Sequence, residues 1–118
     1  MKLIRDKIPM IMNQQGVSFD ARIADNDEYK QLIVEKMHEE VEELMTDKNI
    51  EEAADVYEVF VSLVKLWGHE LHEVIEYADM KRENLGGFDE RVILLKSETY
   101  RPKPSKSKQV SKLFGKPN

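Results

Sequence analysis

Apolar side chains recur at helical spacing along most of this chain, and glycine, proline and asparagine interrupt them. The first predicted helix covers residues 8–15, because Pro9 stands in its first turn, where proline is tolerated, and Gly16 follows as a stop signal. Residues 17–24 alternate loosely between apolar and polar side chains. We therefore expect a short helix followed by an extended segment.

A long helix is predicted from about residue 25 to residue 46, with N-cap side chains offered by residues 25–27 (Asp-Asn-Asp). At about 100° per residue, its apolar side chains share one face. They are Ile33, Val34, Met37, Val41, Leu44 and Met45. Glu40 falls just outside this face and Glu43 lies further round, so we expect both at the rim of a packed surface.

A second long helix is predicted over residues 50–67, capped by Asn49 or Asp47 and ended by Gly68. Its apolar face comprises Ala53, Val56, Tyr57, Val59, Phe60, Leu63, Val64, Leu66 and Trp67. The connection at about residues 46–49 is short, so we expect the two long helices to form an antiparallel hairpin.

The third helix of the predicted core covers about residues 69–84 and ends before Gly86-Gly87, and residues 88–95 form a short extended piece. Its expected buried side comprises Leu71, Val74, Ile75, Ala78 and Met80. The predicted fold is mainly all-α. It is an antiparallel helical hairpin plus a third helix, with short extended N- and C-terminal pieces, and oligomerisation completes a core of four-helix-bundle type.

Length and composition predict one small domain without membrane spans. It has 118 residues, of which 41% are hydrophobic. No apolar run approaches the roughly 18 residues that a span needs, and the charged start over residues 1–6 does not look like a signal peptide. The absence of cysteine excludes disulfides, thiolate metal sites and a cysteine nucleophile. We expect a cytoplasmic protein.

The net charge of −5 conceals two regions of opposite sign. Residues 1–96 carry −10, and residues 97–118 carry +5 together with three prolines. We therefore predict a domain over 1–96 and a basic, flexible tail over 97–118. The tail either contacts nucleic acid, folds back on the acidic domain or remains a solvated extension, and the scarcity of aromatic residues favours the last.

Two acidic pairs on the predicted hairpin are candidates for a metal site. Glu40 and Glu43 are three residues apart, as are Glu52 and Asp55, so each pair shares one helical face. Glu52 falls within the apolar face of its helix, where an ionised carboxylate is costly unless it is paired. In an antiparallel hairpin the four carboxylates converge. Oxygen ligands suit a hard cation, so we expect Mg²⁺ or Mn²⁺ and, with it, phosphate chemistry.

These motifs resemble those of a known enzyme family. Residues 39–43 (Glu-Glu-Val-Glu-Glu) and 52–55 (Glu-Ala-Ala-Asp) are similar to the paired acidic signature of the all-α nucleoside triphosphate pyrophosphohydrolases, in their MazG-like and phosphoribosyl-ATP pyrophosphohydrolase-like branch. The opening 2–9 and the segment 81–91 resemble the two ends of a MazG-like subgroup. The resemblance covers about residues 2–96.

The resemblance implies hydrolysis between the α and β phosphates of a nucleoside triphosphate or related nucleotide, such as phosphoribosyl-ATP, to a monophosphate and pyrophosphate. It implies a metal set of Glu40, Glu43, Glu52 and Asp55, with Glu39 as the general base. The cations expected at the substrate phosphates are Lys81, Arg82, Arg91, Arg5 and Lys7. It also implies a homodimer or a dimer of dimers, with sites near the subunit interface.

Plainer interpretations of the same residues stay open. Glu52 is three residues after Asn49 and has the position of a capping-box acid. Glu40 and Glu43 are also consistent with an ordinary charged face, which pairing with Lys36 would satisfy. Lys81 and Arg82 have the position to complement the dipole at a helix C-terminus.

A second function of another class is consistent with this pattern. It is a non-catalytic helical oligomer that binds nucleotide or nucleic acid in a regulatory role, with the basic tail reaching the nucleic acid. Nothing in the sequence distinguishes which nucleotide an enzyme of this kind would hydrolyse.

Overall fold

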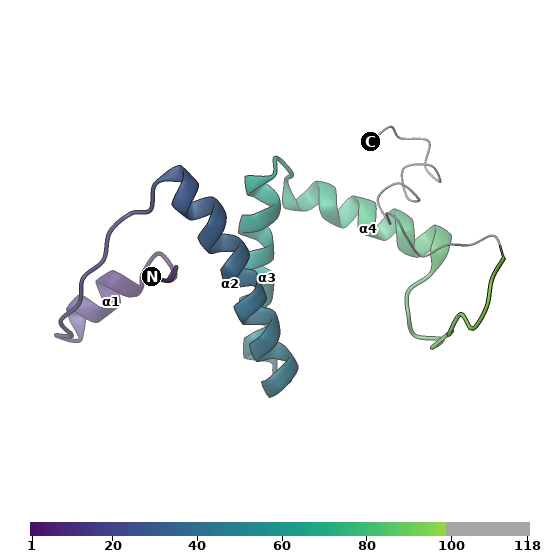
Figure 1. Ribbon diagram of the computed structural model, residues 1–118, viewed down its shortest axis with the longest axis horizontal. Helices are drawn as coiled ribbons and strands as arrows, with labels where there is room; N and C mark the ends of the chain where they lie inside the picture. The colour runs from purple at the N-terminus through teal and green to yellow at the C-terminus, as the bar shows by residue number, and fades with distance from the viewer. Residues whose placement is uncertain (99–118) are drawn as a thin grey trace. The chain divides into compact units, whose positions relative to one another are not determined.

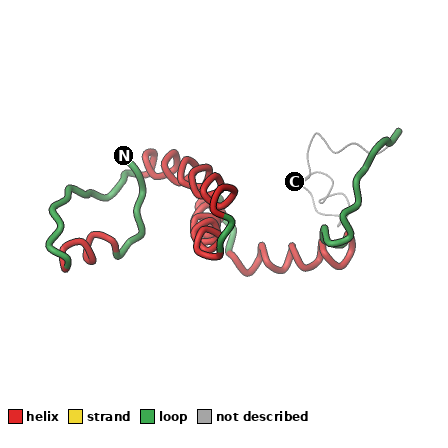
Figure 2. The backbone as a smooth tube through the Cα atoms, turned by 90° about the horizontal axis from the view of Figure 1, so that it is seen from below, coloured by secondary structure: helices red, strands yellow, loops and turns green. Residues whose placement is uncertain are grey.

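A computed structural model describes residues 1–98, which form four α-helices and no strand (Figures 1 and 2). The helices are α1 (Ile8–Gln14), α2 (Asn26–Asp47), α3 (Ile50–Leu66) and α4 (Leu71–Leu85). The mainly all-α class is thereby confirmed. Residues 17–24 and 88–95 have neither helix nor strand.

Helix α2 begins at a complete capping box. The side chain of Asp25 accepts a hydrogen bond from the Glu28 backbone N–H at 2.9 Å, and Glu28 Oε1 accepts one from the Asp25 backbone N–H at 3.1 Å. Two of the N–H groups that a helix start leaves unpaired are satisfied in this way. The structure thus selects Asp25 among the three predicted caps.

Helix α3 follows after only two residues, Lys48 and Asn49, and runs antiparallel to α2 (Figure 1). Asn49 Oδ1 accepts a hydrogen bond from the Glu52 backbone N–H at 2.9 Å, which identifies Asn49 as the cap. At the other end Gly68 has a φ of +89°, a backbone conformation that favours glycine and ends the helix. The predicted hairpin is confirmed.

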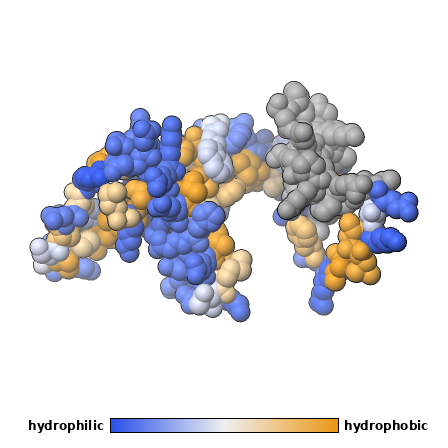
Figure 3. All heavy atoms as spheres, in the orientation of Figure 1, coloured by the Kyte–Doolittle hydropathy of each residue, from blue (hydrophilic) through white to orange (hydrophobic). Residues whose placement is uncertain are grey.

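A small apolar core lies between α2 and α3. Ile33 on α2 and Val59 and Leu63 on α3 are buried against one another. Partly buried side chains pack around them, namely Leu3, Tyr29, Val34, Met37 and Leu66. The outward side of α2 is mostly hydrophilic (Figure 3). Each fully buried side chain of this kind contributes about 1.5–3 kcal/mol, so these few contacts fix the rotation of the two helices.

Some side chains of the predicted apolar faces remain exposed. Met45 on α2 is 65% exposed, and Tyr57 and the helix-ending Trp67 are 51% and 60% exposed. None of the residues of α4 is buried, although Ile75 and Met80 were expected on a buried side. On α2 and α3, apolar side chains remain exposed because one neighbouring helix covers only a stripe of about 100° on a helix surface. The predicted apolar faces are wider than this stripe.

The chain separates into two compact units, Met1–Leu71 and His72–Asn118. The hairpin and the N-terminal segment belong to the first. The second begins within α4, which ends before Gly86, where φ is +81°. The predicted division into 1–96 and 97–118 stays a prediction, because residues 99–118 of the basic tail lie outside the described part of the chain. Among residues 1–98, no helix has both the length and the apolarity to cross a membrane.

Candidate metal centre

The antiparallel hairpin brings three of the predicted metal ligands together. Glu40 lies about two turns before the end of α2, whereas Glu52 and Asp55 lie in the first two turns of α3. One carboxylate oxygen from each of the three lies within 4.8 Å of the others. Carboxylates from two helices, well separated in sequence, therefore form one cluster.

Burial makes this cluster unlike an ordinary charged surface. Glu40 is 6% exposed and is the one buried charged residue among residues 1–98. Its Oε2 atom and the Oε2 atom of Glu52 are buried and have no hydrogen-bond partner within the described residues. Buried carboxylate oxygens are costly when nothing compensates them. These two oxygens therefore fit a bound cation. Glu40 also lies deeper than its predicted position at the rim.

Glu43 lies at the exposed edge of the cluster. Its pKa is raised, first by the negative charge of Glu40, and further by burial and by contact with the carboxyl groups of Glu40 and Glu52. The pKa of Glu52 is also raised, first because burial disfavours its charge and then by surrounding acidic groups, although the contact with Glu43 acts in the opposite direction. Both shifts indicate that negative charge is crowded here.

Two basic side chains contact the cluster. Lys36 Nζ lies 3.1 Å from Glu40 Oε1 and 3.7 Å from Glu39 Oε1. Burial alone would lower the pKa of Lys36, but the hydrogen bond to Glu40 and the nearby negative charges raise it overall. From the N-terminal segment, Arg5 donates a hydrogen bond to Asp55 Oδ1 at 2.6 Å.

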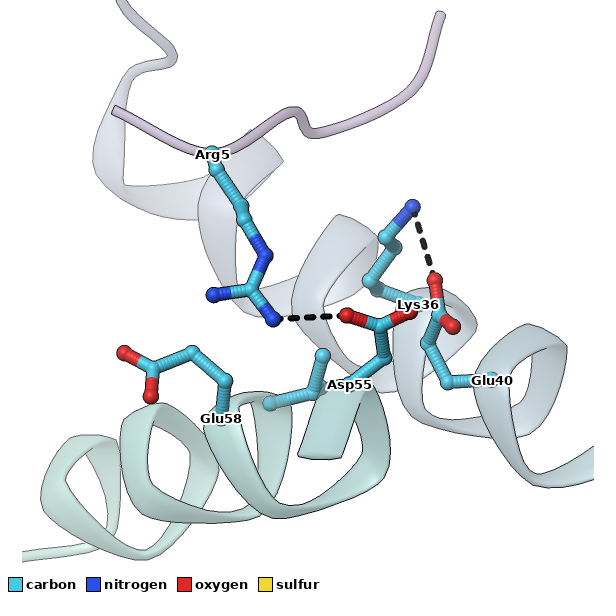
Figure 4. A pocket seen from close by; sticks show the side chains of 6 residues that line it. Arg5, Lys36, Glu40, Asp55 and Glu58 are labelled. Atoms are coloured by element: carbon cyan, nitrogen blue, oxygen red, sulfur yellow. Dashed lines mark hydrogen bonds and ion pairs between the residues drawn. The ribbon is translucent and has the colours of Figure 1, made fainter. Parts of the chain in front are cut away.

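A pocket of about 170 Å³ adjoins the cluster (Figure 4). Its lining comprises Arg5, Lys36, Glu40, Asp55, Glu58 and Val59. Glu58 is not among the site residues predicted from the sequence. It comes three residues after Asp55 and so shares its helical face, a spacing that extends the Glu52 and Asp55 pattern by one more turn.

The predicted general base, Glu39, is not part of the three-carboxylate cluster. It lies next to it, since Lys36 pairs with both Glu39 and Glu40. Its side chain is 42% exposed. Glu39 is thus close to the cluster and accessible to water.

The five predicted phosphate-binding cations are placed differently. Arg5 lies at the cluster, whereas Lys7 is not among the residues that line the pocket. Lys81, Arg82 and Arg91 belong to the other compact unit, His72–Asn118. There Arg82 pairs with Asp79 at 3.6 Å on an exposed surface. The role of these three at a phosphate stays a prediction.

Glu52 makes one of the two hydrogen bonds of a capping box. Its backbone N–H donates to Asn49, as a capping box requires. The return bond from the Asn49 backbone to the Glu52 side chain is not made among residues 1–98, whereas the box at Asp25 and Glu28 has both bonds. The Glu52 carboxylate is directed instead to the cluster.

Comparisons of the chain with models of protein families, with curated proteins and with solved structures find no match. The resemblance to the MazG-like pyrophosphohydrolases therefore rests on the residues quoted for it. The donor set itself consists of carboxylate oxygens without nitrogen or sulfur. Such a set is typical of sites for Mg²⁺ and Mn²⁺.

Proposed function

We propose that this protein is a Mg²⁺-dependent nucleotide pyrophosphohydrolase that releases pyrophosphate from a nucleoside triphosphate or a related nucleotide. The observation that carries the proposal is the cluster of Glu40, Glu52 and Asp55, with two buried oxygens that have no hydrogen-bond partner among residues 1–98. Structural ion pairs alone do not explain it, because Lys36 and Arg5 leave both of these oxygens unsatisfied.

In the proposed enzyme, Glu40, Glu52 and Asp55 hold Mg²⁺ or Mn²⁺, with Glu43 beside them. The bound ion would supply positive charge to the polyphosphate and lower the pKa of a coordinated water. Lys36 pairs with one oxygen of Glu40 and leaves the other oxygen for the ion. Glu39 would accept a proton from the attacking water, since it lies next to the cluster and remains exposed.

The substrate phosphates would enter the pocket beside the cluster. Its lining contains two cations, Arg5 and Lys36, alongside the carboxylates. Charge-assisted hydrogen bonds from such groups are the usual means of binding phosphate oxygens. The phosphate-binding role expected of Lys81, Arg82 and Arg91 stays a prediction.

Pyrophosphate release tests this function directly. The purified chain is incubated with Mg²⁺ and a nucleotide panel that includes ribo- and deoxynucleoside triphosphates and phosphoribosyl-ATP. Glu52→Gln and Asp55→Asn should each lower the rate by about 100- to 1,000-fold, the loss typical when one preorganised electrostatic group is removed. Folding should be retained, because each change relieves repulsion among the carboxylates.

Glu51→Gln is the matched control, since Glu51 is the exposed neighbour of Glu52 on the same helix. It removes the same charge and should leave the rate unchanged. Full activity in both Glu52→Gln and Asp55→Asn would reject the site. Absence of pyrophosphate release across the panel by the folded wild-type chain would favour the non-catalytic, nucleotide-binding alternative.

A further inference from the structure

The N-terminal segment reaches the cluster through one side chain, Arg5. Its guanidinium donates a hydrogen bond to Asp55 Oδ1 at 2.6 Å, across 50 positions of sequence. Two residues earlier, Leu3 packs against the apolar core of the hairpin. Leu3 and Arg5 thus both attach this segment to the hairpin, Leu3 through the apolar core and Arg5 through Asp55.

The Asp55 carboxylate lies between Arg5 and Glu40 (Figure 4). Its Oδ1 atom is on the side of Arg5, and its other oxygen is on the side of Glu40. The guanidinium thus engages one oxygen of Asp55 without standing between the carboxylates. The side of Asp55 that faces Glu40 is therefore not taken up by the guanidinium.

Asp55 needs such a contact more than Glu40 does. The Glu40 side chain is 8% exposed and is held by burial and by Lys36 of its own helix. The Asp55 side chain is 38% exposed, so packing does not fix its orientation. Arg5 is its one ion-pair partner within residues 1–98.

The charges around the cluster are consistent with a bound cation in addition to Arg5 and Lys36. Glu40, Glu43, Glu52 and Asp55, with Glu39 and Glu58 beside them, outnumber Lys36 and Arg5, the basic side chains that pair with the cluster within residues 1–98. An excess of negative charge therefore remains, which a bound cation would offset.

We propose that Arg5 is a positioning residue for metal binding, which holds the Asp55 carboxylate so that its free oxygen faces Glu40. This inference rests on the proposed function, because it presumes that the cluster binds a divalent ion. Hydrogen-bond partners of metal ligands commonly act in this way, and their loss weakens metal binding about 10- to 100-fold.

The test is the affinity of the full chain for Mn²⁺ without nucleotide, measured by calorimetry or by the electron paramagnetic resonance signal of free Mn²⁺. Arg5→Gln should weaken binding by about tenfold or more. Arg5→Lys should lie between it and the wild type, since lysine keeps the charge but loses the planar fork of donors. Asp55→Asn, which alters the ligand itself, should weaken binding at least as much as Arg5→Gln.

Arg22→Gln is the matched control. Arg22 makes a similarly exposed ion pair with Glu28, at 2.5 Å and away from the cluster. This change removes the same charge as Arg5→Gln. Because Arg22 does not contact the cluster, the change should leave the Mn²⁺ affinity unchanged. An equal loss in Arg22→Gln and Arg5→Gln would show a general charge effect and overturn the proposal.

Two further results would overturn it. Unchanged affinity in Arg5→Gln would make the contact an ordinary surface ion pair, and tighter binding would make Arg5 a competitor of the ion. If circular dichroism shows that Arg5→Gln has lost helix, Arg5→Lys decides, and wild-type affinity there rejects the role. A wild-type chain that binds no Mn²⁺ rejects both this inference and the proposed metal site, whereas binding and turnover with no effect of Arg5 reject this inference alone.

Discussion

Glu28 and Glu52 each occupy the third position of a capped helix, and their surroundings give the two carboxyl groups opposite properties. Arg22 donates to both oxygens of Glu28, at 2.8 and 2.5 Å, and together with the Asp25 backbone N–H it lowers the pKa of Glu28 to about 2. The pKa of Glu52 is raised, first because burial disfavours its charge and then by nearby acidic groups. Burial and the nearest charged or donor groups, and not the helix position, decide whether the charged form is favoured.

Arg22→Gln should raise the pKa of Glu28 from about 2 towards its ordinary value of 4.5. A lowered pKa in the folded state stabilises the fold above the pKa of the unfolded chain, and this contribution is lost as pH falls through the folded value. The wild-type chain should therefore lose this contribution between about pH 5 and pH 2, and the variant should lack it.

Carboxyl-carbon NMR titration of Glu28 measures the change. Arg5→Gln, which removes an arginine elsewhere in the same unit, should leave the Glu28 titration unaltered. A pKa near 2 that persists in Arg22→Gln would show that the capping bond from Asp25 dominates, contrary to this account.

At the scale of elements, the α2–α3 hairpin both forms the core and positions the site. Val59 belongs to the apolar core and also lines the pocket, and it follows Asp55 by about one turn of α3. Ile33 on α2 packs against the same apolar cluster, about two turns before Glu40. The apolar contacts therefore set the distance between the carboxylates of the two helices.

Leu63→Ala should destabilise the fold by about 2–5 kcal/mol, because Leu63 is 7% exposed and its truncation leaves a cavity in a small core. Urea unfolding followed by circular dichroism gives the free energy of unfolding. Leu85→Ala is the control, since Leu85 is 58% exposed at the end of α4 and its loss should cost no more than about 0.5 kcal/mol. Equal effects of the two changes would contradict the described core.

At the scale of the whole molecule, α3 presents a second apolar stripe away from the α2 contact. Ile50, Ala53, Ala54 and Tyr57 are exposed and follow the i, i+3, i+4, i+7 spacing of a helix-packing face. Ile50 is 85% exposed and Tyr57 is 51% exposed. We propose that a second copy of the chain covers this stripe, in a homodimer or a dimer of dimers.

Sedimentation velocity at several concentrations tests the proposed assembly. The wild-type chain should sediment as a dimer or tetramer, and Tyr57→Glu should shift it towards the monomer, because an ionised carboxylate in an apolar interface is costly. Lys30→Glu, at an exposed position of α2, introduces the same residue away from the stripe and should not alter the assembly. A monomeric wild-type chain at all concentrations would reject the proposal.

Helix boundaries are the part of the fold that local sequence predicts well. The bounds of α2 and α3 agree with expectation within one or two residues, because Asp25, Asn49 and Gly68 act on the backbone next to them. The hairpin also follows from sequence, since a two-residue connection leaves the helices few alternatives to an antiparallel course.

The candidate site was predictable only in part. Glu40, Glu52 and Asp55 were identifiable from spacing, because residues three apart share a helical face. The depth of Glu40, the place of Glu58 and the pairing of Arg5 with Asp55 were not, since they depend on which faces of two helices meet and on where a distant segment crosses them.

By itself, the sequence determined four helices, their caps and an unusual set of carboxylates on the two longest, because these depend on neighbours within about one turn. Tertiary structure alone decided which carboxylates meet, which of their oxygens are buried without a partner, and which cations approach them. The physical reason is that electrostatic environment depends on distance in space, and the rotation of α2 against α3 is set by the packing of a few apolar side chains.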